Sequence, residues 1–366
     1  MKKVIWVILA GALLFWGYRL WAQARKSQPA TEKMLIAPSF SPTKKLVVAN
    51  KEKSLFVPYW SFGSAQDKTN LEDLSPKYDR LIYFGVAANK QGIDRQDNGY
   101  QQLESFNKMV NGEQEKFLTL RLLNTADNLK ILADSTTQQK IIKDSVELAQ
   151  RYRFQGVVLD LELSVLSFED TAKQVNQFVA SFYQQTQDRQ LRLAVALYGD
   201  VFYRKRPYEV EIIANNCDEI MVMAYDFHKS YGEPGPNFPY LGKEKYAYDF
   251  QTMIGDYLKV VPPEKLSVIF GLYGYDWTLG HQGKPLKSAE AVTLSQIEQK
   301  FADPCPFTAC QKSTDKHSQE STITYQDEDG RKHSVWYEDQ RSAAVKTEWL
   351  SEQGIGNIAF WAHGYF

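Results

Sequence analysis

Two carboxylates set two positions apart are the residues of this chain best suited to proton chemistry. Asp160 and Glu162 lie in the apolar run 154–163. Because alternate residues of an extended strand share a face, we expect both acids to point one way and the aliphatic residues around them to point the other. An unpaired carboxylate is costly to bury. An acid pair on a buried strand therefore indicates general acid–base chemistry; the alternatives are an exposed edge strand with solvated acids or a structural ion pair.

Three later stretches place aromatic and acidic residues at the ends of strand-like segments. They are Met223–Asp226, Leu272–Trp277 and Ala359–Trp361. Flat apolar faces of this kind suit a sugar-binding cleft, although packing in the core also explains aromatic residues such as Tyr59 and Trp361. A tyrosine at a strand end followed by a helix cap is the other explanation for the first stretch.

The elements that must position these residues alternate between strand-like and helix-like patterns. Strand-like runs cover 55–60, 81–86, 116–123, 154–163, 191–197, 219–225, 266–273 and 355–361. Helical spacing covers 100–110, 136–151, 168–187 and 246–258. Strands and helices in this alternation predict an α/β fold, a (β/α)8 TIM barrel, whose active site lies at the carboxyl ends of the strands. Glu162 stands at one of those ends.

One interval, 278–336, breaks the alternation. It is long and polar, and we interpret it as an insertion between the seventh and eighth strands that builds one wall of a cleft. Within it, Asp329 and Gly330 stand between strand-like flanks, a pattern that favours a tight turn. We therefore predict a hairpin over 325–333.

The three cysteines divide into a pair and a single residue. Cys305 and Cys310 bracket the loop Pro-Phe-Thr-Ala, close enough for a disulfide if the backbone turns correctly. Cys217 lies beside a predicted strand and is interpreted as a small buried hydrophobic residue. Neither the cysteines nor the five scattered histidines have the spacing of a metal site. No metal or cofactor is expected.

The N-terminus has the pattern of an export or anchoring segment. A basic start precedes the uncharged run 4–18, and a small-x-small cleavage pattern follows at 22–24. Residues 1–24 are therefore either a cleaved signal peptide or a single-pass membrane anchor, followed by a linker at 25–45 and a barrel body at 46–366. Both alternatives place the body outside the cytoplasm, where disulfides persist.

Charge excludes one class of partner. The 43 Lys and Arg residues balance 44 Asp and Glu residues, which leaves no electrostatic footprint for nucleic acid. Contact with a membrane is expected only through the N-terminal segment.

Taken together, the strand-end motifs resemble glycoside hydrolase family 18, the family of chitinases and related N-acetylglucosaminidases. The resemblance spans about 55–361, and its four motifs occur in the family's order at barrel-like spacing. The stretch Val335–Asp339, followed by Ser342 and Lys346, resembles the subgroup that contains spore-cortex and peptidoglycan-lytic members.

The family's acidic motif, DxxDxDxE, is only partly present. Its final Glu, the proton donor, corresponds to Glu162, and the Asp before it, which supports the donor, corresponds to Asp160. Gln155 and Val158 stand where the two earlier acids would be. An Asp at position 158 would face the same interior as Asp160, so its replacement removes one like charge and one hydrogen-bond partner. We expect weaker activity as a result.

The resemblance implies retaining, substrate-assisted hydrolysis of β-1,4 bonds in a polymer containing N-acetylglucosamine, with peptidoglycan as the first candidate and chitin as the second. Tyr225 would bind the acetamido oxygen, and Asp226 would hydrogen-bond Glu162 or the sugar. Aromatic residues would contact the substrate, with Trp361 as the floor; the others are Tyr59, Phe84 and Trp277. The competing function is a non-catalytic, lectin-like barrel, because part of the acidic motif is missing.

Overall fold

The computed structural model describes residues 51–64, 71–110, 114–166 and 168–366. The predicted signal peptide or anchor and the predicted linker lie outside the described residues. Within the described part of the chain, no helix is long and apolar enough to cross a membrane.

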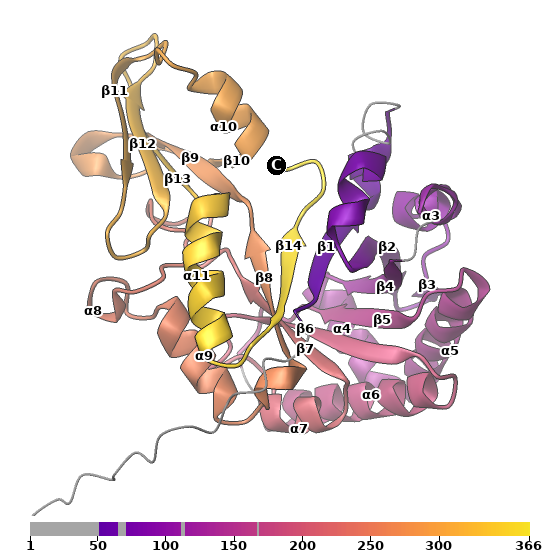
Figure 1. The fold of residues 1–366 in the computed structure, drawn as a ribbon. Coiled ribbons are helices and arrows are strands. Elements are labelled where there is room, and N and C mark those ends of the chain that lie inside the picture. The colour runs from indigo at the N-terminus through magenta and orange to yellow at the C-terminus, as the bar shows by residue number, and fades with distance from the viewer. Residues whose placement is uncertain (1–50, 65–70, 111–113, 167) are drawn as a thin grey trace, which may run out of the picture. The chain divides into compact units, whose positions relative to one another are not determined.

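Parallel strands close into a barrel, because β1 pairs with both β2 and β14. Figure 1 shows these strands in the middle of the molecule, with helices outside them. The barrel strands are β1 (Lys53–Pro58), β2 (Arg80–Asn89), β4 (Glu115–Leu122), β5 (Gly156–Leu161), β6 (Arg192–Tyr198), β7 (Glu219–Ala224), β8 (Leu266–Gly271) and β14 (Asn357–Trp361). The predicted (β/α)8 TIM barrel is confirmed. A short strand, β3 (Gly92–Ile93), pairs antiparallel with the end of β2.

Several helices begin at side-chain caps, and the long helices pack through apolar faces. Asn124, Asp134 and Asp249 each accept a hydrogen bond from a backbone N–H in the first turn of a helix. On α6 the buried residues include Val175, Phe178, Val179 and Phe182, the spacing of one helical face. The helices are α3 (Asn98–Met109), α4 (Thr125–Ala133), α5 (Ser135–Arg151), α6 (Glu169–Gln187), α7 (Val210–Asn215), α8 (Lys243–Tyr246), α9 (Phe250–Leu258) and α11 (Gln340–Glu352).

Strand β5 separates its side chains as the alternation predicts. Val157, Leu159 and Leu161 join the core that extends through the helical layer. Val158 joins a second cluster inside the barrel, and Asp160 is on the same side of the strand. At the amino end of the strands, the buried Arg80 pairs with Glu219 at 2.6 Å. Access to the interior acids is therefore from the carboxyl ends of the strands.

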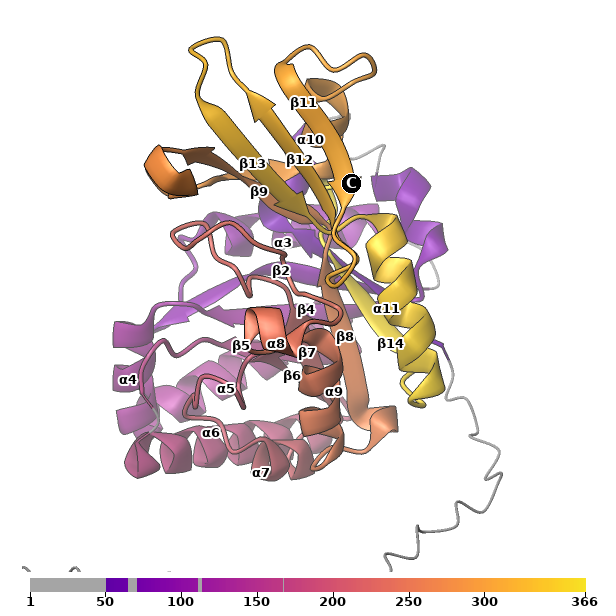
Figure 2. The ribbon, with the colours of Figure 1, turned by 90° about the vertical axis from the view of Figure 1, so that its left-hand side faces the viewer.

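A second, antiparallel sheet is inserted between β8 and β14 and stands above the barrel (Figure 2). It contains β10 (Glu290–Thr293), β9 (Tyr273–Leu279), β13 (Lys332–Tyr337), β12 (Ser321–Gln326) and β11 (Thr308–Thr314), with α10 (Leu294–Lys300) after β10. The predicted hairpin is confirmed, because β12 pairs with β13 and Gly330 adopts a φ of 74° in the turn.

The boundary of this insertion differs from the prediction. The seventh barrel strand ends at Gly271, and the stretch from Tyr273 belongs to β9 of the small sheet. The predicted strand 266–273 therefore runs too far, and the predicted insertion at 278 begins too late. The alternation of Tyr, Gly, Tyr, Asp and Trp from Tyr273 onward forms a strand with two different faces, and its pairing with β10 and β13 assigns it to the second sheet.

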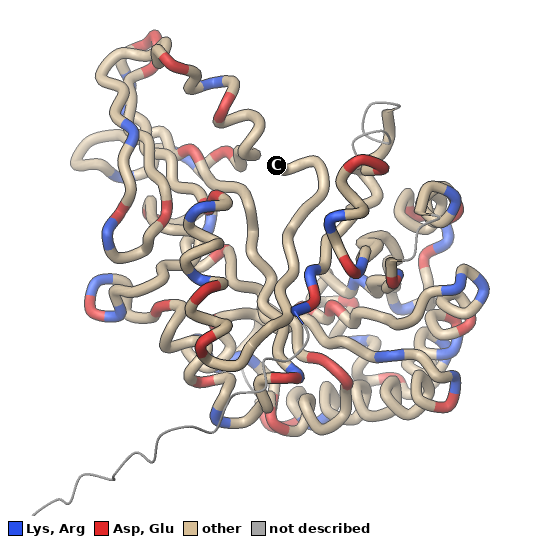
Figure 3. Tube along the Cα trace, viewed as in Figure 1, with Lys and Arg blue, Asp and Glu red and all other residues tan. Residues whose placement is uncertain are grey.

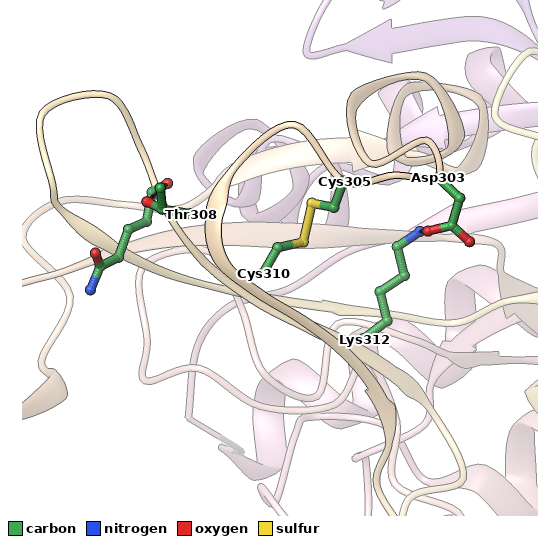
Figure 4. The surroundings of a disulfide bond; sticks show 6 residues. Asp303, Cys305, Thr308, Cys310 and Lys312 are labelled. Atoms are coloured by element: carbon green, nitrogen blue, oxygen red, sulfur yellow. Dashed lines mark hydrogen bonds and ion pairs between the residues drawn. A yellow bond between two sulfur atoms is a disulfide. The ribbon is translucent and has the colours of Figure 1, made fainter.

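A disulfide joins Cys305 and Cys310 across the loop before β11, with their Cα atoms 6.4 Å apart (Figure 4). The nearby Lys312 and Asp303 form an ion pair at 3.4 Å. Cys217 is fully buried, as expected for a small hydrophobic residue. Figure 3 shows basic and acidic residues interspersed along the described elements.

Candidate active site

Glu162 follows the last residue of β5 and lies at the mouth of the barrel. Its Oε2 accepts a hydrogen bond of 2.8 Å from the Tyr198 hydroxyl, at the end of the neighbouring strand β6. Two hydrogen bonds hold its backbone. Its N–H donates to the Leu122 carbonyl of β4 at 2.8 Å, and its carbonyl accepts from Asn128 Nδ2 of α4 at 2.8 Å. The carboxylate is thus fixed at the rim, with its second oxygen available to a ligand.

Asp160 lies one layer below Glu162 and is 5% exposed. Among the residues that the structure describes, its Oδ1 has no hydrogen-bond partner. Burial and the charge of Glu162 raise the pKa of Asp160 well above its usual range, while Arg121 opposes this rise. A buried acceptor without a partner is rare and costly, so this oxygen is suited to receive an N–H from a bound molecule.

Val158 lies on the same side of β5 as Asp160 and has an apolar side chain. On the adjacent strand β4, Thr119 is its register partner, and the Thr119 Oγ1 atom is also buried without a hydrogen-bond partner in the described part of the chain. As expected from the sequence, Val158 offers no polar group to Asp160. Val158 thus supplies no hydrogen bond to either of these two buried atoms.

Tyr225 and Asp226 come directly after β7. The Asp226 Oδ1 accepts hydrogen bonds from the hydroxyls of Tyr273 and Tyr275, the latter at 2.7 Å. Its backbone is left-handed, with a φ of 57°, and its N–H donates to Asn237 Oδ1 at 2.7 Å. The alternative of a helix cap is wrong, because the next helix along the chain is α8.

Tyr225 presents a hydroxyl near the two acids. Burial, and then the charges of Asp160 and Glu162, raise its pKa well above the usual range for tyrosine. Its hydroxyl therefore keeps its proton at neutral pH and can donate a hydrogen bond. This property suits a group that binds a carbonyl oxygen.

Trp361 ends β14, is partly exposed, and lies among several other aromatic rings, which together we call the aromatic floor. The Tyr225 ring is stacked with it at 6.5 Å between centroids, and Phe84 meets it edge-on at 4.7 Å. Trp60 lies 6.2 Å away and is 45% exposed, and Tyr59 packs edge-on against Trp60. The structure thus brings together three predicted aromatic contacts, Trp361, Phe84 and Tyr59. Trp60, which the sequence places beside Tyr59 at the end of the first strand as either a cleft or a packing residue, lies with them.

Trp277 is not at this rim. Its side chain is fully buried, and its Nε1 donates to the Gly232 carbonyl at 3.0 Å. Asp276, on the opposite face of β9, is also buried and accepts from Tyr325 at 2.7 Å. The expectation that Trp277 contacts substrate is therefore corrected: it packs the small sheet against the loop after β7.

A small pocket of about 70 Å³ opens beside Glu162. Residues that sequence reasoning missed contribute to it: Tyr198, Asp200 and Lys229. A larger hollow of about 470 Å³ lies between α11 and the outer side of β14, away from the strand ends, so we assign the chemistry to the smaller pocket. In the described part of the chain, no group of His, Cys, Asp and Glu is placed to hold a metal ion.

Comparisons with known proteins identify a family and a shared fold. The family model for glycosyl hydrolases family 18 matches residues 55–365. A cortical fragment-lytic enzyme of Bacillus cereus is 24% identical over 311 residues, covering 80% of this chain and 66% of that protein. The chain spans only 52% of the corresponding Bacillus anthracis enzyme.

Two solved structures share the fold. The Bacillus cereus spore cortex-lytic enzyme SleL has a TM-score of 0.68 at 20% identity, covering 86% of this chain and 71% of that one. A GH18 chitinase from Cycas revoluta, in complex with (GlcNAc)3, has a TM-score of 0.69 at 23% identity, covering 86% of this chain and 95% of that one.

Proposed function

Because the chain belongs to glycosyl hydrolases family 18, we propose that it hydrolyses β-1,4 bonds in a polymer containing N-acetylglucosamine, with retention and with the substrate's acetamido group as nucleophile. Peptidoglycan is the first expected substrate and chitin the second. The names of relatives support this choice, since they include a cortical fragment-lytic enzyme and a di-N-acetylchitobiase. The observation that carries the proposal is the pairing of a rim carboxylate, Glu162, with a buried carboxylate oxygen of Asp160 that has no partner in the described residues.

In the first step, protonated Glu162 donates its proton to the glycosidic oxygen as the bond to the anomeric carbon breaks. The acetamido carbonyl oxygen of the same sugar forms a bond to that carbon, which gives a cationic oxazolinium ion. Asp160 accepts the acetamido N–H and stabilises this charge, and Tyr225 donates to the acetamido oxygen to hold the attacking geometry.

In the second step, water attacks the anomeric carbon from the face that the leaving group has vacated. The Glu162 carboxylate takes a proton from this water, so the acid is regenerated and the acetamido group is restored. The two inversions give net retention. Trp361 supplies the apolar surface beneath the reacting sugar, with Phe84, Trp60 and Tyr59 beside it.

A non-catalytic sugar-binding barrel is the second candidate function. The observation that favours it is the apolar Val158 in the acidic motif, which leaves Asp160 without the partner that an acid there would supply. In this case the same floor would bind sugar without turnover.

The two functions separate in one set of assays on the full chain. We expect release of product from a chromogenic N-acetylglucosamine oligomer and from purified peptidoglycan, but none from fully deacetylated chitosan or cellulose, since these lack the internal nucleophile. Saturable binding with no turnover would favour the lectin-like function. Cleavage of deacetylated chitosan would contradict the mechanism.

We also infer that the barrel works outside the cytoplasm. The Cys305–Cys310 disulfide supports an oxidising compartment, and a cell-wall polymer is found there. Whether residues 1–24 are cleaved or retained as an anchor is tested by N-terminal sequencing of the exported protein.

A further inference from the structure

Arg121 stands directly across from Asp160 in the barrel. Strands β4 and β5 run parallel, and their register pairs Arg121 with Asp160 as it pairs Thr119 with Val158. Leu118, Leu120 and Leu122 of β4 belong to the outer core, so the alternate residue Arg121 points to the interior. A guanidinium and a buried carboxylate therefore share one layer of the barrel mouth.

The guanidinium is held firmly in this place. Its Nη2 donates to the Gly85 carbonyl at 2.9 Å and to Asp97 Oδ1 at 2.6 Å. Its plane lies over the rings of Tyr59, at 5.0 Å, and Phe84, at 5.5 Å. The side chain is 10% exposed, and the buried Nε has no hydrogen-bond partner in the described residues. Arginine keeps its charge in such surroundings.

Arg121 acts on Asp160 without bonding to it. The two side chains form no ion pair within 4.0 Å, so the free Asp160 oxygen stays available. Three other titratable groups act on or respond to Asp160: Glu162 on its own strand, Tyr208, and Tyr225 at the end of β7. The two tyrosines carry no charge at neutral pH. Of the groups that shift its pKa appreciably, Arg121 alone favours the charged carboxylate.

We propose that Arg121 is a positioning residue of this active site, whose fixed charge favours the anionic form of Asp160 while leaving its free oxygen to the substrate. The proposal rests on the proposed function, in which Asp160 must accept the acetamido N–H and face a cationic intermediate. A direct ion pair would occupy the carboxylate oxygens, whereas attraction across the strand pair lowers the cost of the charge and leaves them free. With Val158 unable to share a proton, the charge on Asp160 depends on Arg121.

The test compares wild type with Arg121→Gln, Arg121→Lys and a matched control, Arg192→Gln. Arg192 is the first residue of the barrel strand β6, pairs with Glu115, and has its Cζ 4.7 Å from the centroid of the Phe117 ring. It therefore stands at the opposite end of the barrel from Arg121. The first readout is the pH dependence of kcat/KM on an N-acetylglucosamine oligomer. The second is the titration of the Asp160 carboxyl carbon by 13C NMR, assigned with Asp160→Asn.

We expect Arg121→Gln to raise the measured pKa of Asp160 by about one unit or more and to move the acidic limb of the activity profile upward by the same amount. Activity then falls about tenfold on that limb, and the loss shrinks as the pH rises. Arg121→Lys should restore part of the shift, and Arg192→Gln should cause none.

Two results would overturn the proposal: an Asp160 titration that is the same in Arg121→Gln and wild type, or a loss of activity that is equal at every pH, which indicates packing alone. Failure of the proposed function looks different. If wild type cleaves no acetylated polymer while Arg121→Gln still shifts the Asp160 titration, the electrostatic role of Arg121 stands and the hydrolase assignment falls.

Discussion

Two clusters of charged residues in this protein, one fully buried and one partly exposed, differ in how their polar atoms are satisfied. The insertion-foot cluster consists of Glu320, Glu338 and Lys346, each fully buried. The barrel-mouth cluster consists of Asp160, Glu162 and Asp226. The first lies where the small sheet meets α11, and the second lies at the carboxyl ends of the barrel strands.

The insertion-foot cluster is satisfied by its own members and the backbone. Lys346 Nζ donates to Glu320 at 3.2 Å, to Glu338, and to the Phe238 carbonyl at 2.6 Å. Glu320 also accepts the backbone N–H groups of Asn237 and Phe238, at 2.5 and 2.7 Å. Its charges are paired and its oxygens are occupied, which is the arrangement that a structural role requires.

The barrel-mouth cluster leaves bonding capacity unused. Asp160 keeps an oxygen with no partner in the described residues, and Glu162 has one neutral donor, Tyr198, for a single oxygen. Asn237 links the two clusters by hydrogen bonds: its N–H donates to Glu320, and its Oδ1 accepts from the Asp226 N–H. Burial of charge is therefore not by itself a sign of function, since the insertion-foot cluster is buried and fully bonded. Buried polar atoms without a hydrogen-bond partner are the more informative feature.

The largest effect on activity is expected for Glu162→Gln in the barrel-mouth cluster. The amide keeps the shape of the side chain but cannot donate the acidic proton, so we expect kcat to fall by about 10²–10⁴-fold. Binding of an N-acetylglucosamine oligomer, measured by calorimetry, should change little. Retained turnover would show that the proton donor has been assigned wrongly.

Loss of the cation at the insertion foot should affect stability rather than chemistry directly. In Lys346→Met, two buried carboxylates lose their common partner, and we expect the free energy of unfolding to fall by about 3–5 kcal/mol. Urea unfolding followed by fluorescence measures this. The control is Lys312→Met, which removes an exposed ion pair to Asp303 and should cost under about 1 kcal/mol.

Asp160→Asn should separate function from stability within the barrel mouth. Activity should fall, because the charge that faces the intermediate is gone. Above the folded pKa of Asp160 the variant should be more stable than wild type by about 1–3 kcal/mol, because only wild type then carries a buried charge without a partner. The pKa of Asp160 is raised on folding, so its contribution to stability is complete at low pH and is lost as the pH rises through the folded value. The gain should therefore vanish in acid and grow as the pH rises, and a difference in stability that is the same at every pH would contradict this account.

The smallest expected effect is a change of slope in Glu338→Gln. Burial, together with the charge of Glu320, raises the pKa of Glu338 from 4.5 to about 7, against the attraction of Lys346. The unfolded chain then binds fewer protons than the native state between these values, so the Glu338 contribution to wild-type stability falls across pH 4.5–7. The slope is at most about 1.4 kcal/mol per pH unit. The unfolding free energy of wild type, measured relative to that of Glu338→Gln, should therefore fall as the pH rises across this range. Parallel curves for the two proteins would disagree with the prediction.

The barrel could be predicted because its pattern is local. Runs such as 116–123 and 191–197 repeat an apolar strand between helix-like segments, and the structure places β4 and β6 there within two residues. The orientation of Asp160 followed from the two-residue period of a strand. The limits of β8 did not follow, since Tyr273–Leu279 has an equally good strand pattern and only its partners, β10 and β13, decide which sheet it joins.

Patterns within single segments were enough to predict the barrel strands, the helices α3, α5, α6 and α9, the face of β5 that carries the acids, and the disulfide, because these depend on residues close together in the chain. Only the tertiary structure decided which groups meet those acids. Tyr198 reaches Glu162 across 36 positions and Tyr275 reaches Asp226 across 49, and Arg121 faces Asp160 through the register of two strands. Such partners are chosen by closure of the barrel, and side-chain periodicity within one segment carries no information about which strand will lie beside it.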